Sequence, residues 1–466
     1  MCFTKALMDP ILAEDESPVV TAGLGTQIYV TGRWTQGDRE RMMSLMVDER
    51  ESSESSTVVD RSEGFGERLL GSLIDRAHRM PPHMIAPLIE QEIAIIGGRD
   101  VEVLLQDYDQ MTLVPLPGER LLKGGPQSID ESTAGRAFKT DVAIEEAQAD
   151  GVRIFVPLLD GTDRVGVLVF TLDAVDDNDR RLTRRLAGLV ADILITKSMY
   201  TDRFFQARRR QPMSLSAEMQ WQLLPPLMMS TPQVAIAGAL EPAYDVAGDS
   251  FDYALNDDVL HLAMIDAMGH GLSAAVMATL AMGAYRHARR LDVGLDGLYV
   301  AMDEAIAGQF GADRFVTAQM ARLDVRSGQL QWVNAGHPTP LLLRDPHLVA
   351  ELTSPTTLPV GFGGATPVVS ERSLERGDRV LFFTDGVIEE DRTSGGASGE
   401  TRLRNLVEQI STNQDPVQET VRLLSKALML ERRGVTSDDA TLLLLEWRGG
   451  TAEDLTPIGE AVSPTG

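Results

Sequence analysis

The sequence has 466 residues, with 43 Lys and Arg against 69 Asp and Glu, for a formal net charge of −26. At about 100–200 residues per domain, this length predicts two to four domains. The negative field repels phosphate backbones and anionic lipid, so we expect neither nucleic acid nor a membrane as a partner. Most carboxylates are expected to form a solvated surface, which leaves open a small group gathered around a cation.

Cysteine content and the N-terminal segment constrain the compartment. Cys2 is the single cysteine, which excludes a disulfide framework and a cysteine-rich zinc site. Residues 1–15 contain acidic side chains and Pro10 and no long apolar run, so no signal peptide is predicted. No apolar run approaches the ~20 residues of a membrane span. We therefore expect a cytoplasmic protein.

Residues 1–63 show little helical or strand periodicity and include the Ser/Glu-rich run 51–57. Such a composition buries too little apolar surface to order itself, so we predict a flexible arm. A flexible tail is likewise predicted at 448–466.

From residue 64 the apolar pattern becomes regular. Helices are predicted at 69–77, 85–96, 133–139 and 177–195, and strands at 101–105, 111–116, 154–159 and 165–171. This order of elements resembles a GAF-type sensory domain over 64–198, which implies an α/β module that binds a signal. A module that serves only for dimerisation remains the alternative.

Residues 199–231 are predicted to form a linker helix. Ser214 and the amphipathic segment up to Leu224 indicate a helix that ends at Pro225. The basic run Arg208–Arg210 is expected to be a solvated face of the linker. We expect the chain to form a homodimer through 196–224, and the packing of this segment to set activity.

Residues 232–447 carry stronger strand signals, which come in groups. Strands are predicted at 234–240, 259–265, 316–325, 329–334, 340–344, 379–384 and 440–447, and helices at 272–291, 294–309, 401–410 and 417–433. Grouped strands and helices favour an antiparallel α+β sandwich over a doubly wound parallel sheet.

Four aspartates of this second module are predicted to lie at strand ends. Asp266 and Asp385 end predicted strands, Asp439 precedes one, and Asp249 follows one. Antiparallel pairing would bring such ends to one edge, and adjacent glycines would let the backbone approach an ion. Hard oxygen ligands suit Mg²⁺ or Mn²⁺. Spacing alone leaves ordinary turn residues as an equal alternative.

Seven sequence blocks resemble the bacterial PPM-type (protein phosphatase 2C-like) serine/threonine phosphatases, in the branch of stage II sporulation protein E and sigma-factor regulators. They occur in the family's order over about 217–447. They are Leu223–Pro225, Asp245–Asp252, Ile265–Gly271, Asn334–Pro338, Leu358–Gly361, Phe383–Val387 and Ser437–Thr441. The resemblance implies an α-β-β-α sandwich and a site for two Mn²⁺ or Mg²⁺ ions.

By the same resemblance, Asp266 would bridge the two ions, with the main-chain carbonyl of Ala267 contributing to one. Asp385 and Asp439 would hold the other ion, and Asp249 would act on the second, through water. Asp266 and Asp249 are therefore also the predicted catalytic residues. Two cations about 3.5–4 Å apart lower the pKa of a shared water and clamp the phosphoryl oxygens, so no protein nucleophile is needed.

Other residues of the motifs are weighed separately. His270 could protonate the leaving serine oxygen, but a turn-supporting role is favoured, and His337 is expected to be structural. Asp252 and Asp438 are expected to be solvated or to support the ligands. We find no counterpart of the arginine that grips phosphate in eukaryotic relatives, which suggests that the docked partner positions its own phosphoserine.

The resemblance implies a phosphoprotein phosphatase that acts on a phosphorylated anti-sigma-factor antagonist under control of the N-terminal module. A non-catalytic signal-binding or scaffold protein with a phosphatase-like docking domain is the alternative. A two-metal nuclease or nucleotide hydrolase would use similar chemistry, but the acidic field and the lack of a basic groove disfavour polynucleotides.

Overall fold

The structure is a computed structural model, and its chain forms two compact units, Met1–Val59 and Asp60–Gly466. It describes residues 19–22, 26–29, 63–118, 121, 124–161, 163–244, 248–355, 357–388, 398–431 and 439–451. In the first unit, β1 (Val19–Ala22) and β2 (Thr26–Tyr29) form an antiparallel pair. Most of the predicted flexible arm at 1–63 and of the tail at 448–466 lies outside the described residues.

The second unit begins with an N-terminal module built on a six-stranded antiparallel sheet of order β5-β4-β3-β8-β7-β6. Its strands are β3 (Arg99–Gln106), β4 (Thr112–Pro115), β5 (Gln127–Ser128), β6 (Ile144–Gln148), β7 (Gly151–Asp160) and β8 (Asp163–Leu172). Its helices are α2 (Glu63–Arg79), η1 (Pro82–Met84), α3 (Ile85–Ile95), α4 (Thr133–Thr140) and α5 (Asp177–Ser198).

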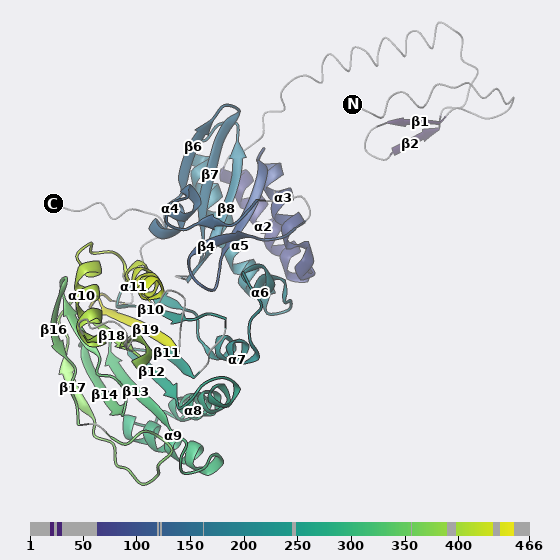
Figure 1. Ribbon diagram of the computed structural model, residues 1–466. Coiled ribbons are helices and arrows are strands. Elements are labelled where there is room, and N and C mark those ends of the chain that lie inside the picture. The colour runs from purple at the N-terminus through teal and green to yellow at the C-terminus, as the bar shows by residue number, and fades with distance from the viewer. Residues whose placement is uncertain are drawn as a thin grey trace, which may run out of the picture. The chain divides into compact units, whose positions relative to one another are not determined.

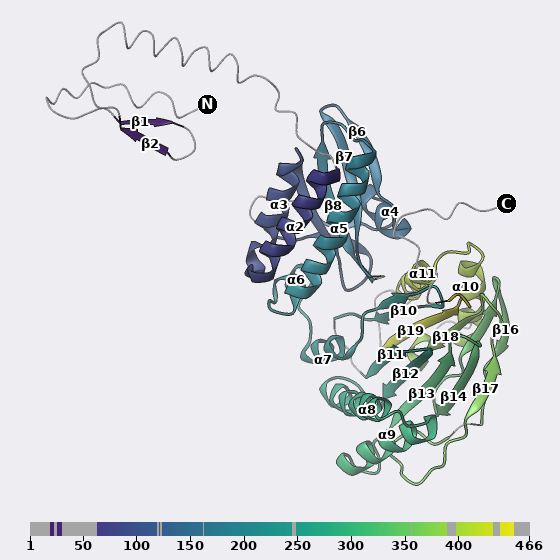
Figure 2. The ribbon, with the colours of Figure 1, turned by 180° about the vertical axis from the view of Figure 1, so that it is seen from behind.

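The helices cover the two faces of this sheet unequally. α2, α3 and α5 pack on one face around a large apolar core (Figure 2). α4 covers the other face, where Phe138 and Ile129 pack against a smaller core. The order of the predicted helices and strands is observed. β5 and β6 were not predicted, since β5 has two residues and the side chains of β6 are largely exposed, which removes the apolar signal.

α5 starts at a reciprocal capping box, in which Asp176 and Asp179 each accept from the other's backbone N–H. With 22 residues it is a long helix, but charged residues run along it. None of the helices in the described ranges combines the length and the apolar composition needed to cross a bilayer.

The linker differs from the single helix predicted at 199–231. It contains two short helices, α6 (Arg203–Ala207) and α7 (Leu215–Leu223), followed by strand β9 (Met228–Ser230). Ser214 caps α7 by accepting a hydrogen bond from the Ala217 N–H, as its position predicts. α7 packs on α8 and β9 pairs with β10, so the C-terminal module begins before residue 232.

The C-terminal module is a sandwich of two antiparallel sheets, of order β16-β15-β18-β19-β10-β9 and β11-β12-β13-β14-β17. The first sheet also contains β10 (Val234–Glu241), β15 (Leu341–Arg344), β16 (His347–Glu351), β18 (Arg379–Phe383) and β19 (Ala440–Trp447). The second contains β11 (Asp249–Asn256), β12 (Val259–Ala267), β13 (Val316–Asp324), β14 (Gln329–Ala335) and β17 (Ser370–Ser373).

Two helix pairs enclose this sandwich (Figure 1). α8 (Leu272–Arg290) and α9 (Leu295–Gln309) pack on the sheet that contains β12. α10 (Gly399–Ser411) and α11 (Val417–Glu431) pack on the sheet that contains β19. A third apolar core fills the space between the sheets, which gives the α-β-β-α order of layers.

Asp249 follows β10 in the chain, as predicted, and is also the first residue of β11, a strand that was not predicted. Polar and acidic residues interrupt the apolar pattern of β11, which removes the strand signal. The strands β16 and β17 were also missed; neither contains a buried residue. Asp385 starts a short 3-10 helix, η2 (Asp385–Ile388), instead of a glycine turn.

Candidate active site

Asp249 and Asp266 lie directly opposite each other on the neighbouring strands β11 and β12. They occupy the same face of the sheet as Phe251 and Met264, because side chains on a strand alternate between faces. Those two residues belong to the core between the sheets. The two aspartates therefore point into the sandwich, at the end where β11 begins and β12 terminates.

Asp249 is held by hydroxyl groups from the opposite sheet. Its Oδ2 accepts hydrogen bonds from Thr384 Oγ1 at 2.6 Å and from Thr441 Oγ1 at 2.8 Å. Burial raises the pKa of Asp249 well above its usual value, and the charges of Asp266 and Asp439 raise it further. The two threonine hydroxyls counteract this shift. Asp249 thus lies in a field of like charges that favours a bound cation.

Asp439 is buried immediately before β19, the strand that provides Thr441. Its Oδ2 accepts hydrogen bonds from Gln220 Nε2 at 2.9 Å and from the Asp249 N–H at 3.3 Å. Gln220 Nε2 also lies 2.8 Å from the main-chain oxygen of Asp249. One buried side chain of α7 therefore holds two predicted ligand residues together. Sequence reasoning missed Gln220, since only its burial distinguishes it from other helical glutamines.

Asp385 is placed beside this group by its neighbours. The preceding residue, Thr384, contacts Asp249, and its backbone N–H donates to the Thr441 oxygen at 3.1 Å. At Gly386 a side chain would collide with the main-chain oxygen of Asp439. The glycine therefore permits close packing of η2 against the start of β19. Asp385 itself is exposed.

Ala267 is fully buried and its N–H donates to the Gly248 oxygen at 3.1 Å. The turn that follows contains Gly269 and Gly271, with φ of 92° and 71°. These values lie in the region that favours glycine, which explains the Gly-His-Gly sequence. His270 is exposed between the two glycines.

The donor set fits a hard divalent cation. Within the described ranges, no three acidic, histidine or cysteine side chains form a group already arranged to hold a metal ion. Asp266 and Asp439 nevertheless act electrostatically on the buried Asp249 and raise its pKa. Carboxylates that repel one another in this way are the oxygen ligands that Mg²⁺ and Mn²⁺ prefer. Their assignment as metal ligands stays a prediction.

Two further motif residues have structural contacts. His337 is buried, its Nδ1 lies 2.8 Å from Thr317 Oγ1, and its main chain is held by Asn334. Burial lowers the pKa of His337 to about 3, so the ring is neutral near pH 7, which matches the expected structural role. Asp252 is buried and paired with Arg286 and Arg289 of α8, so it is not a solvated carboxylate. Asp438 lies outside the described residues.

Residues 256–448 match the family model described as Stage II sporulation protein E (SpoIIE). This match confirms, for that segment, the resemblance that the sequence motifs indicate. It begins within β11 and ends just after β19, so it includes Asp266, Asp385 and Asp439.

The chain is also similar to characterised bacterial proteins. Phosphoserine phosphatase RsbP of Bacillus subtilis (strain 168) is 28% identical over 165 residues, 34% of this chain and 40% of RsbP. Phosphoserine phosphatase RsbU of the same organism is 22% identical over 253 residues, 53% of this chain and 72% of RsbU. Among solved structures, the SiaA-PP2C domain of Pseudomonas aeruginosa is 22% identical with a TM-score of 0.42, covering 50% of this chain and 94% of that domain.

Proposed function

We propose, from the membership of residues 256–448 in the stage II sporulation protein E family, that this chain is a metal-dependent serine/threonine phosphoprotein phosphatase. The observation that carries the proposal is the buried contact of Asp249 and Asp439 at the end of the sandwich, with Asp266 opposite Asp249. The names of RsbP and RsbU, both phosphoserine phosphatases, support the substrate class.

The residues would then have the following roles. Asp266, with the Ala267 carbonyl beside it, would serve both divalent ions, Asp385 and Asp439 would hold one, and Asp249 would act on the other. When bound, two Mn²⁺ or Mg²⁺ ions supply a water of lowered pKa and neutralise charge on the phosphoryl group.

The chain's own hydrogen bonds preorganise this ligand set. Thr384 and Thr441 orient the Asp249 carboxylate, and Gln220 holds that of Asp439. Fixed donors of this kind keep carboxylates in a productive geometry, as the residues that support metal ligands do elsewhere.

The N-terminal module is proposed to be a GAF-like sensor that controls the phosphatase, in a cytoplasmic homodimer. Its six-stranded sheet with helices on both faces is compatible with this role. The proposed substrate is a phosphorylated anti-sigma-factor antagonist, in keeping with the sigma-factor regulator branch of the family.

Phosphate release from phosphoserine proteins, with and without Mn²⁺, tests the activity. We expect Asp266→Asn and Asp385→Asn to lower the Mn²⁺-dependent rate at least about 100-fold, since both remove a ligand charge. Asp292→Asn removes an exposed acidic charge of the same module and should leave the rate unchanged. Wild-type activity in both ligand variants would refute the assignment.

A non-catalytic docking role is the second candidate, and metal binding separates the two. The phosphatase should bind Mn²⁺ in calorimetric titrations, and Asp249→Asn with Asp439→Asn should abolish the binding. A scaffold would bind Mn²⁺ equally poorly with or without these changes.

A further inference from the structure

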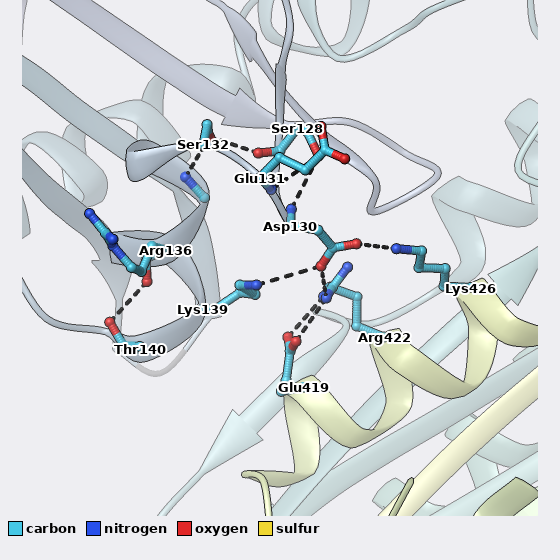
Figure 3. Close-up of polar contacts among 11 residues, drawn as sticks. Ser128, Asp130, Glu131, Ser132, Arg136, Lys139, Thr140, Glu419, Arg422 and Lys426 are labelled. Carbon is cyan, nitrogen blue, oxygen red and sulfur yellow. Dashed lines mark hydrogen bonds and ion pairs between the residues drawn. The ribbon is translucent and has the colours of Figure 1, made fainter. Parts of the chain in front are cut away.

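An ion-pair cluster joins the N-terminal module to helix α11 of the C-terminal module (Figure 3). Asp130 lies in the turn between β5 and α4, and its Oδ1 accepts from Arg422 Nη2 at 2.5 Å. Its Oδ2 accepts from Lys426 Nζ, and Lys139 Nζ of α4 lies 3.5 Å from Oδ1. Asp130 and Arg422 are 292 residues apart in the sequence, so the cluster exists only because the two modules meet.

Arg422 does not depend on Asp130 alone. Its side chain is 3% exposed, and Glu419, one helical turn earlier, accepts from its Nε at 2.8 Å and its Nη2 at 2.7 Å. An unpaired buried charge is costly, but the Glu419 pair would remain if Asp130 moved away. Lys426 is 31% exposed and can be solvated by water. Asp130 is therefore a partner that can leave without stranding a buried cation.

The turn presents Asp130 in a fixed geometry. Ser128 Oγ accepts from the N–H groups of Asp130 and Glu131 at 3.2 and 3.3 Å, and Ser132 caps α4 through the Gly135 N–H at 2.9 Å. Burial alone would raise the pKa of Asp130, but hydrogen bonds from Lys426 and Arg422 outweigh it and lower the pKa to about 2. The carboxylate is thus ionised and prearranged at neutral pH.

The turn also belongs to the thinner layer of the N-terminal module. Ile129 is fully buried in the small core beneath α4, next to Asp130. One helix of 8 residues covers this face of the sheet, whereas α2, α3 and α5 cover the other. A layer with few buried contacts opens at a lower free energy than the rest of a fold. Movement of α4 would carry Asp130 with it.

At its other side, α11 is linked to the strand pair next to the candidate site. Ser425 Oγ donates to Glu241 Oε1 at 3.2 Å, and Glu241 is paired with Ala440 across β10 and β19. Ala440 immediately follows Asp439. One hydrogen bond and one strand pair therefore separate the ion-pair cluster from a predicted metal ligand.

We propose that Asp130 forms a reversible docking contact, the dock, with Arg422 and Lys426 of α11. Through the dock, the α4 layer of the N-terminal module controls how firmly Asp439 is held. The partner of Arg422 and Lys426 is the acidic turn of this same chain that carries Asp130, because the two side chains present two donors to one carboxylate. The effect on Asp439 rests on the proposed phosphatase function, whereas the dock itself does not.

Hydrogen–deuterium exchange of the full-length chain tests the dock. Asp130→Asn and Lys426→Gln should each speed exchange about five- to tenfold in 127–133 and 417–431, as expected for loss of a charged hydrogen bond. The double variant should match Asp130→Asn, since that change already removes the Lys426 contact together with the Arg422 contact. Arg422 is left intact so that Glu419 keeps its partner. Asp177→Asn, an exposed acid of the same module that pairs with Arg180, serves as the control. Unchanged exchange in both segments would overturn the dock.

Mn²⁺ titration tests the coupling to Asp439, with calorimetry for binding and p-nitrophenyl phosphate for activity. Asp130→Asn should weaken Mn²⁺ binding about three- to tenfold and raise the Mn²⁺ concentration for half-maximal rate equally, with kcat at saturating Mn²⁺ unchanged. Faster exchange with unaltered Mn²⁺ binding would overturn the coupling. If the wild-type chain binds Mn²⁺ but hydrolyses no phosphate ester, the proposed function fails, and the exchange and binding results still decide the inference.

Discussion

Gln220 and Asp439, which are 219 residues apart in the sequence, are joined by a buried hydrogen bond of 2.9 Å. Gln220 belongs to α7, and the next residue, Trp221, meets the Tyr108 ring of the N-terminal module edge to face, with centroids 4.6 Å apart. The Trp221 Nε1 also donates to the Ala243 oxygen at 2.8 Å. Adjacent side chains of one short helix thus contact the candidate site and the N-terminal module.

Gln220→Ala should raise the Mn²⁺ concentration for half-maximal phosphatase rate about tenfold. The change removes the donor shared by the Asp249 oxygen and Asp439 Oδ2, and loss of a residue that orients a ligand lowers metal affinity by about 10–100-fold. Calorimetry with Mn²⁺ measures the affinity directly. Gln222→Ala alters a neighbouring glutamine of the same helix and should leave affinity unchanged. Equal affinities in both variants would contradict the role of Gln220.

Gly386→Ala should reduce the phosphatase rate at least about 100-fold, because a Cβ there collides with the Asp439 oxygen and must displace Asp385 or Asp439. Gly283→Ala is the matched change, since no atom lies near its Cβ position in α8. That variant should keep full activity and gain up to about 1 kcal/mol of unfolding free energy from helix propensity. Phosphate release and urea denaturation provide the two measurements. A fully active Gly386→Ala variant would show that the backbone of η2 can shift freely.

Asp252→Ala should lower the unfolding free energy by about 3–5 kcal/mol, the usual cost of breaking a buried ion pair from one side. The carboxylate accepts from Arg289 Nη1 at 2.6 Å, and both side chains are nearly inaccessible to water. Urea denaturation measures the loss. Asp292→Asn, at an exposed position whose left-handed backbone Asn also tolerates, should change the free energy by less than about 0.5 kcal/mol. A loss for Asp252→Ala as small as this would mean that Arg289 finds another partner.

His261 should make the protein less stable as the pH falls from about 7.5 to about 5. Burial, together with the nearby charges of Arg322 and Arg289, lowers the pKa of His261 to about 4. The unfolded state binds a proton on this ring below pH ~6.5, whereas the folded state binds it only near pH 4. The free energy of unfolding therefore decreases as the pH falls. Between pH 7.5 and pH 5 the loss is about 2 kcal/mol.

His261→Gln removes the titrating group and should flatten this pH dependence in urea denaturation. His287→Gln changes an exposed histidine of α8 and should leave the slope as in the wild type. The same slope in all three proteins would assign the pH dependence to other groups.

Much of the element order was predictable because local patterns carry it. Period-two apolar runs located β7, β8, β10, β12, β13 and β19, and the helical period located α8, α9 and α11. Strands with exposed faces, such as β6 and β17, lack that pattern and were missed. The segment 199–231 was predicted as one helix. The N-cap signal at Ser214 marks where one helix starts, and it could not show that the segment contains α6, α7 and β9.

The sequence by itself determined which residue types stand at the strand ends, since Asp266, Asp385 and Asp439 and their glycines occur in recognisable blocks. It also determined the acidic net charge, which gives no position for a cation. Only the tertiary structure decided that Asp249 and Asp439 are buried together across two sheets, that Gln220 joins them, and that Asp130 reaches Arg422. The physical reason is that local backbone preferences act over a few residues, whereas these contacts arise when distant segments are packed side by side and their charges lose water.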